Sequence, residues 1–219
     1  YLFTLGLFKK VLLADTLGGA VDFGYANLGA LNSADAVIVM LSYTLQLYFD
    51  FSGYCDMAMG IAGMFGIELP LNFNSPYKAS NIMEFWQGWH ITLTRFFTRY
   101  LYIPLGGNRK GKYRTYINCL IVFFISGIWH GAGWQFIIWG LMHGILYVAV
   151  RAWKDSHAGK ENENHGKNKI FHAASVLFTF LYVNIAWIFF RAPSVKEALE
   201  LIKTICSFRF TRINWDLAG

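Results

Sequence analysis

The stretch TYINCLIVFFISGIWHGAGWQFIIWGLMHGILYVAV, residues 115–150, decides the fold class, because it holds no charged side chain in 36 consecutive positions. An uncharged apolar run of 18 or more residues is typical of a membrane-spanning helix. As one straight helix it would extend about 54 Å, whereas a hydrocarbon core is about 30 Å thick. Gly131 and Gly133 lie near its middle. We therefore predict a helical hairpin with arms of about 22 Å each and a tip inside the membrane region.

The composition of the whole chain also indicates a membrane protein. Of its 219 residues, 55% are apolar and only 15% are charged, whereas a soluble domain has about 25% charged residues. The net charge of +6 comes from cations that flank apolar runs, so we expect no nucleic acid partner. The positive-inside rule places both flanks of the hairpin, residues 109–114 and 151–169, on the cytoplasmic side of a cell membrane.

Four further regions are separated by charge and composition. Residues 1–34 mix charges and glycines with apolar residues, which predicts an interfacial or broken segment. Residues 36–66 are long enough for a span, and residues 67–81 have the composition of an irregular connection. Residues 170–190 form a neutral span. Together these regions predict an all-α, multi-pass transmembrane protein with short or re-entrant helices.

The segment 82–103 mixes aromatic and charged side chains. On one continuous helix these would fall on opposite sides, with Glu84, Arg95 and Arg99 facing away from Trp86, His90, Phe97 and Leu101. We therefore predict an interfacial amphipathic helix that ends at Gly106 and Gly107. A second amphipathic helix is predicted after Ser194, because Ser194 and Glu197 have the spacing of a capping box.

His130 is the first candidate for chemistry, because it lies at the tip of the predicted hairpin between Trp129 and Trp134. Non-helical backbone is tolerated at membrane depth only where protein buries it or where it lines a wet cavity. An imidazole is the usual proton acceptor for activating a hydroxyl. The alternative is a histidine that is hydrogen-bonded within a packed core. His90 is the second candidate, since it is predicted to face the aromatic side of the segment 82–103.

Asp50 forms a polar stripe with Gln46 and Tyr54, one helical turn away on either side. A charge at mid-membrane costs about 2.5–3.5 kcal/mol on insertion scales, so such a residue is usually partnered or functional. A structural hydrogen-bond network is the alternative. Asp56 projects about 120° away, so the two acids are not expected to act as a pair. His143 has G-x-x-x-G spacing around it, which favours a packing role. No histidine pair has i, i+4 spacing, so no metal site is predicted.

Six segments follow one another in a recognisable order: YFDFSGYCDMAMGIAGMFGI (48–67), LPLNFNSPY (69–77), FWQGWHITL (85–93), YLYIPLGGNRKG (100–111), GIWHGAGWQFIIWGLMHG (127–144) and WIFFRAPSVKEAL (187–199). Together they resemble the membrane-bound O-acyltransferase family, and within it the bacterial branch of alginate and peptidoglycan O-acetyltransferases. The resemblance runs from about residue 45 to residue 199. Family members are about twice as long, so residues 1–219 are expected to be a C-terminal portion of the family domain.

The resemblance implies a membrane enzyme that moves an acyl group, here acetyl, from a cytoplasmic donor to a hydroxyl of a cell-envelope or exported polysaccharide. His130 matches the catalytic histidine of the W-H-G motif, and His90 matches the histidine of F-W-x-x-W-H. Four residues are assigned to substrate binding: Asp50, Trp86, Trp129 and Asn108. The expected donor is acetyl-CoA or an acyl-carrier protein, with no tightly bound cofactor. Membrane lipid and an extracytoplasmic acetyltransferase protein are the expected partners, in a bacterial cytoplasmic membrane.

Two alternatives stay open at this point. The first is D-alanyl transfer to teichoic acid from a carrier protein. The second is a transport or scaffold subunit in which histidines and aspartates form a proton or substrate path without making bonds. Transporters often carry internal repeats with paired broken helices, and no second copy of WHGAGW or FDFSGY occurs in the chain. The enzyme hypothesis is therefore preferred.

Overall fold

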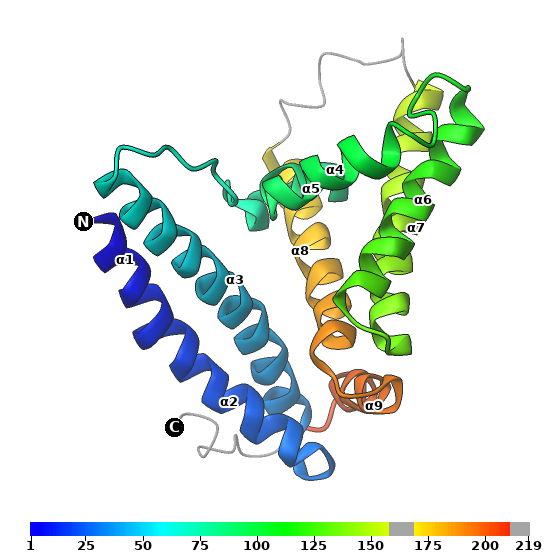
Figure 1. The fold of residues 1–219 in the computed structure, drawn as a ribbon. Coiled ribbons are helices and arrows are strands. Elements are labelled where there is room, and N and C mark those ends of the chain that lie inside the picture. The colour runs from blue at the N-terminus through cyan, green and yellow to red at the C-terminus, as the bar shows by residue number, and fades with distance from the viewer. Residues whose placement is uncertain (158–168, 211–219) are drawn as a thin grey trace. The chain divides into compact units, whose positions relative to one another are not determined.

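The computed structural model describes residues 1–157 and 169–210, and every regular element within them is helical. The chain forms two compact units, residues 1–71 with 187–219 and residues 72–186. Both are built from long helices (Figure 1). The all-α prediction is confirmed.

In the first unit, an N-terminal helical segment packs along one long helix. The segment consists of α1 (Leu2–Phe8), a π-helical stretch (Lys9–Ala14) and α2 (Asp15–Ala26), and it lies beside α3 (Ser33–Met64) (Figure 1). The predicted broken segment is therefore helical with a π-helical interruption. Gly6 and Gly53 permit the close approach, because a Cβ on Gly6 would lie 2.5 Å from the carbonyl oxygen of Gly53.

The π-helical stretch carries the two lysines that pair with the acids of α3. Lys9 binds Asp56 at 2.6 Å, and Lys10 binds both Asp15 and Asp50 at 2.8 Å. The two aspartates of α3 thus have separate partners. This agrees with the prediction that they do not act as a pair. Asp50 and Asp56 are thus each paired with a lysine of the neighbouring helical segment.

The long helix α3 contains 32 residues and extends about 48 Å. The side chain of Asn32 accepts hydrogen bonds from the first-turn amides, and Asp35 completes a capping box. After Met64 the chain is irregular up to residue 81, apart from a 3-10 turn at Pro76–Lys78. The predicted connection is confirmed; the region predicted as a span is one long helix, but α3 is not among the helices apolar enough to count as candidate membrane spans in the described part of the chain.

The predicted single helix over 82–103 is wrong. The segment forms α4 (Ile82–Gly88), α5 (Ile91–Phe97) and a π-helical stretch (Thr98–Tyr102). The break lies at His90, whose φ of +44° places it in the left-handed region. Since the two short helices have different axes, the helical-wheel argument for opposite faces does not extend across the break.

The predicted hairpin is confirmed as α6 (Lys112–His130) and α7 (Trp134–His157), which run side by side (Figure 1). Gly127 and Gly140 bring the two helices together, because a Cβ at either glycine would overlap a backbone carbonyl of the other helix. The arms extend about 28 and 36 Å, not 22 Å, because both helices continue into the charged flanks. α7 is therefore long enough to cross a membrane.

Two helices among the described residues are long and apolar enough to cross a membrane, namely α7 and α8 (Lys169–Arg191). α8 matches the predicted neutral span. Beyond it, the Oγ of Ser194 accepts from the backbone N–H of Glu197 and begins α9 (Val195–Cys206). The predicted start of this amphipathic helix is confirmed.

Candidate active site

His130 is the last residue of α6, at the turn into α7, and its side chain is half-buried. Its ring packs edge-on against two indoles, with centroid distances of 4.8 Å to Trp129 and 5.1 Å to Trp139. Gly131 follows directly and ends the helix. The hairpin tip therefore presents an imidazole framed by two indoles, of which Trp139 comes from α7 and was not among the neighbours named from the sequence.

His90 lies at the break between α4 and α5, and a neighbouring loop holds it there. The Oδ1 atom of Asn72 lies 3.3 Å from His90 Nδ1 and also accepts from the backbone N–H and hydroxyl of Thr92, at 3.2 and 2.6 Å. The backbone N–H of Ile91 donates to the carbonyl oxygen of Asn72 at 3.1 Å. Because the surrounding contacts fix it, His90 can keep a backbone conformation that is rare for a residue with a Cβ.

These contacts assign a protonation state to His90. Two donors from Thr92 identify the Asn72 atom as the oxygen, so His90 Nδ1 must carry the proton. His90 lies outside the two candidate spans, and burial lowers its pKa to about 4. At neutral pH the ring is therefore uncharged and its Nε2 atom has an acceptor lone pair.

The two candidate histidines come together in space although 40 positions separate them in the sequence. Both belong to the unit 72–186, and they lie close enough for a charge on His90 to disfavour a charge on His130. One lies at the end of α6 and the other at the kink between α4 and α5. The sequence predicts each histidine separately, and the fold places them at one site.

An aromatic cluster adjoins the histidines. The indole N–H of Trp86 donates to Nδ1 of His143 at 3.3 Å, and the Trp86 ring lies 6.0 Å from that of Trp139. Phe85 and Phe123 stack on the imidazole of His143, which has no exposed surface. The packing role predicted for His143 is confirmed.

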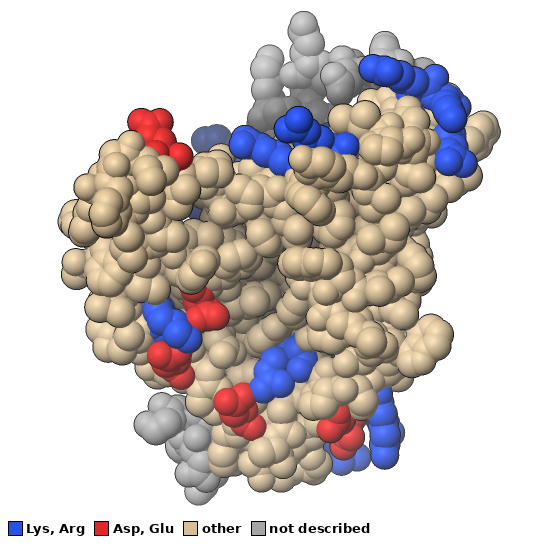
Figure 2. Space-filling model, in the orientation of Figure 1, with Lys and Arg blue, Asp and Glu red and all other residues tan. Residues whose placement is uncertain are grey.

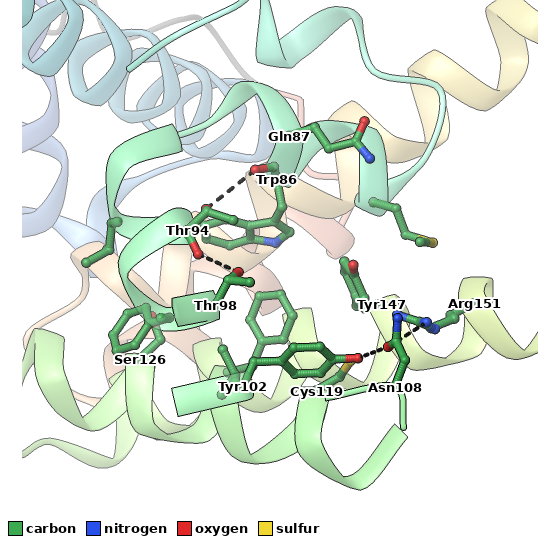
Figure 3. A pocket seen from close by; sticks show the side chains of 15 residues that line it. Trp86, Gln87, Thr94, Thr98, Tyr102, Asn108, Cys119, Ser126, Tyr147 and Arg151 are labelled. Atoms are coloured by element: carbon green, nitrogen blue, oxygen red, sulfur yellow. Dashed lines mark hydrogen bonds between the residues drawn. The ribbon is translucent and has the colours of Figure 1, made fainter. Parts of the chain in front are cut away.

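A cavity of about 250 Å³ lies beside this cluster (Figure 3). Its lining is mainly apolar, with Trp86, Phe97 and Phe123 among the walls. Its polar part is lined by Tyr102, Asn108 and Arg151. The Tyr102 hydroxyl and the Arg151 guanidinium both donate a hydrogen bond to Oδ1 of Asn108 (Figure 3).

The four residues assigned to substrate binding lie in different surroundings. Trp86 and Asn108 line the cavity. Trp129 is 60% exposed beside His130. Asp50 belongs to the other unit, where it is paired with Lys10. Within residues 1–157 and 169–210, no three His, Cys, Asp or Glu side chains gather closely enough to hold a metal ion.

Sequence reasoning missed three residues of this region. Asn72 orients His90. The one sequence feature that could have pointed to Asn72 is its position in the segment LPLNFNSPY. Tyr102 lies in YLYIPLGGNRKG, and Arg151 is the first charged residue after the neutral run. None of the three has a local pattern that marks it, because each acts through partners distant in the sequence.

A model of the membrane-bound O-acyltransferase family matches residues 1–190 of the chain. The chain belongs to this family. Three relatives are similar over nearly its whole length. Peptidoglycan O-acetyltransferase of Helicobacter pylori is 51% identical over 93% of this chain and 37% of its own length. The probable alginate O-acetylase AlgI of Pseudomonas putida is 42% identical over 99% of this chain and 42% of its own length. The protein of the same name from Azotobacter vinelandii is 41% identical over 94% of this chain and 39% of its own length.

This membrane-bound O-acyltransferase chain thus spans about two fifths of the length of the relatives it matches. The family resemblance inferred from the six segments is confirmed, as is the multi-pass membrane class. The roles of His130, His90 and the substrate-binding candidates stay predictions.

Proposed function

We propose that the full-length protein transfers an acetyl group to hydroxyls of a cell-envelope or exported polysaccharide. The observation that carries the proposal is the convergence of His90 and His130 at one aromatic-walled site, in a chain 51% identical to a peptidoglycan O-acetyltransferase. The identities to proteins named alginate O-acetylases support the same class of acceptor.

In the proposed reaction, His130 accepts the proton of the attacking hydroxyl. The hydroxyl oxygen forms a bond to the carbonyl carbon of the donor thioester, the C–S bond breaks, and the thiol leaves with a proton returned from His130. His90 is neutral with its proton on Nδ1, so its Nε2 positions a hydroxyl by accepting a hydrogen bond. The aromatic rings around the site limit access of water that would hydrolyse the thioester.

The membrane arrangement follows from the cations that flank the α6–α7 hairpin. Residues 109–114 and Lys154 are placed on the cytoplasmic side of the bacterial membrane, where acetyl-CoA or an acyl-carrier protein supplies the acetyl group. The acceptor hydroxyl approaches from the opposite side. A separate extracytoplasmic acetyltransferase protein is the proposed partner that completes delivery to the polymer.

The test measures ester-linked acetate released by mild base from envelope polysaccharides of cells that carry the full-length protein. His130→Ala is expected to lower the released acetate by about 10²–10⁴-fold, the usual contribution of general acid–base catalysis. The matched control is His172→Ala, because His172 is exposed on α8. Both variants are compared at equal membrane abundance.

Two outcomes would contradict the proposal. Unchanged acetate in His130→Ala would remove the catalytic role of this residue. A loss of D-alanine esters with no change in acetate would replace acetyl transfer by D-alanyl transfer to teichoic acid. Separating acetate from D-alanine by chromatography in the same base extract distinguishes these two results.

A further inference from the structure

A second cavity, of about 300 Å³, lies between α7 and α8. Leu146 and Val150 of α7 form one wall, and Ala174 and Phe178 of α8 form the other. All its lining residues belong to the unit 72–186, and it shares none of them with the cavity of Figure 3. Phe178 is 62% exposed, so the cavity opens on the outer face of the helix pair. We call it the α7–α8 groove.

The groove lies at membrane depth, because α7 and α8 are the two candidate spans among the described residues. At one end, the hydroxyl of Tyr182 donates to the carbonyl oxygen of Met142 at 2.7 Å and joins the two helices. From there, Leu146, Val150 and Lys154 follow at four-residue intervals and form one stripe of α7. The stripe from Met142 to Lys154 extends about 18 Å, which is close to the roughly 15 Å of hydrocarbon in one leaflet. The groove therefore has a length that suits one acyl chain.

The other end of the groove lies at the start of α4, where Ser80 and Asn81 line it. These two residues fix the carboxylate of Glu84. The N–H and hydroxyl of Ser80 donate to its Oε2 at 2.9 and 2.7 Å, and the Asn81 amide donates to its Oε1 at 2.7 Å. Burial raises the pKa of Glu84, but these bonds and the nearby charge of Lys154 outweigh it and hold the pKa below its usual value. Glu84 is therefore ionised at neutral pH and lies near Lys154.

Lys154 and Glu84 bring opposite charges close together at this end. Both side chains are exposed, and within residues 1–157 and 169–210 neither belongs to an ion pair. The ammonium and the carboxylate therefore both retain hydrogen-bonding capacity for a ligand. Figure 2 shows further Lys and Arg side chains gathered over the end of the α6–α7 pair. The positive-inside rule places this end on the cytoplasmic side, where lipid head groups lie.

We propose that the α7–α8 groove binds a phospholipid of the cytoplasmic leaflet whose head group carries a primary ammonium. One acyl chain lies between the apolar walls, the phosphate contacts Lys154, and the ammonium contacts Glu84. Phosphatidylethanolamine has this chemistry, with a phosphate and an ammonium close together above its apolar chains. Basic pockets between membrane helices on the cytoplasmic side typically bind lipid head groups. The site does not depend on the proposed acyl transfer, and a lipid bound there stabilises the folded protein by mass action.

The test uses purified full-length protein in detergent and native mass spectrometry, which counts bound lipids and gives an apparent Kd for each. The probes have identical acyl chains and three head groups. Phosphatidylglycerol has no ammonium, and the ammonium of phosphatidylcholine has no N–H. Wild type is expected to bind phosphatidylethanolamine about tenfold more tightly than the other two, because only its ammonium donates a hydrogen bond to a carboxylate.

Two substitutions test the charges. Lys154→Gln is expected to weaken binding of all three lipids about fivefold, the usual contribution of one cation near a lipid surface. Glu84→Gln is expected to weaken binding of phosphatidylethanolamine and to tighten binding of phosphatidylglycerol, because it removes an attraction in the first case and a repulsion in the second. Misfolding does not tighten binding, so this reversal separates the proposal from damage to the start of α4. Thermal unfolding of each variant verifies that it is folded.

Ala174→Phe tests the groove itself, because the added ring occupies the space beside Phe178. It is expected to weaken binding of every lipid about tenfold or more by displacing buried methylenes. The matched control is Ala173→Phe, since Ala173 is exposed on the same helix and does not line the groove. Its Kd values are expected to stay within about twofold of wild type. Equal Kd values in Ala174→Phe and wild type would overturn the proposal and indicate that another part of the full-length chain covers the groove. Equal affinity of wild type for the three lipids would overturn it as well.

Discussion

The indole N–H of Trp86 donates a hydrogen bond to Nδ1 of His143 at 3.3 Å, and this bond joins α4 to α7. Both side chains are buried. Trp86 also lines the cavity, so one side chain joins α4, the helix hairpin and the cavity wall. Together with the ring contacts of Phe85 and Trp86, this pair holds α4 against the hairpin.

Trp86→Phe is expected to lower the free energy of unfolding by about 1–3 kcal/mol, because it leaves a buried acceptor without its donor. Thermal unfolding of the full-length protein in detergent measures the effect. Trp153→Phe is the matched control, since Trp153 is 52% exposed on α7. A normal Tm combined with lost acetylation would show instead that Trp86 acts directly on a substrate.

Asn72→Ala is expected to reduce acetylation about tenfold or more at equal abundance, because the orientation and proton position of His90 depend on Asn72 Oδ1. Asn72→Asp keeps an acceptor oxygen and is expected to retain more activity than Asn72→Ala. Asn74→Ala is the control, since Asn74 is exposed and its backbone bond to Gly88 is unaffected by the change. Equal activity of Asn72→Ala and Asn74→Ala would contradict the positioning role.

Protonation of His90 is expected to destabilise the folded protein as the pH falls. Burial lowers the pKa of His90 from 6.5 to about 4, so the folded state favours the neutral ring. The resulting stability is complete above pH 6.5 and is lost as the pH falls toward 4. Relative to His90→Gln, the Tm of wild type is therefore expected to fall more steeply between pH 6.5 and pH 4. Parallel Tm curves for the two proteins would show that His90 does not titrate as described.

Gly140→Val is expected to disrupt the packing of the hairpin, because even a Cβ at this position would overlap the carbonyl oxygen of Phe123 on α6. Overpacking costs about 1–3 kcal/mol or more, and separation of α6 from α7 also displaces His130. Gly19→Ala is the control, since a Cβ there meets nothing within 4 Å. It is expected to stabilise α2 by about 0.5–1 kcal/mol. Thermal unfolding of both variants measures the contrast, and a wild-type Tm in Gly140→Val would contradict the close approach.

The sequence alone determined the features that depend on local composition. The neutral run of 115–150 required a helical hairpin, because its length exceeds a bilayer and its glycines allow a turn. The six ordered segments identified the family, which the match over residues 1–190 confirms. His130 was predicted as a candidate because its motif lies at the hairpin tip.

Only the tertiary structure decided how the separate segments meet. Segment 82–103 has the pattern of one helix, yet bonds from Asn72 stabilise a left-handed residue at His90 and break it into two. Hydrogen bonds and packing between residues far apart in the sequence outweigh local helix propensity, and no local pattern reveals them. For the same reason, the structure alone joined Arg151 to Asn108 and placed His90 beside His130.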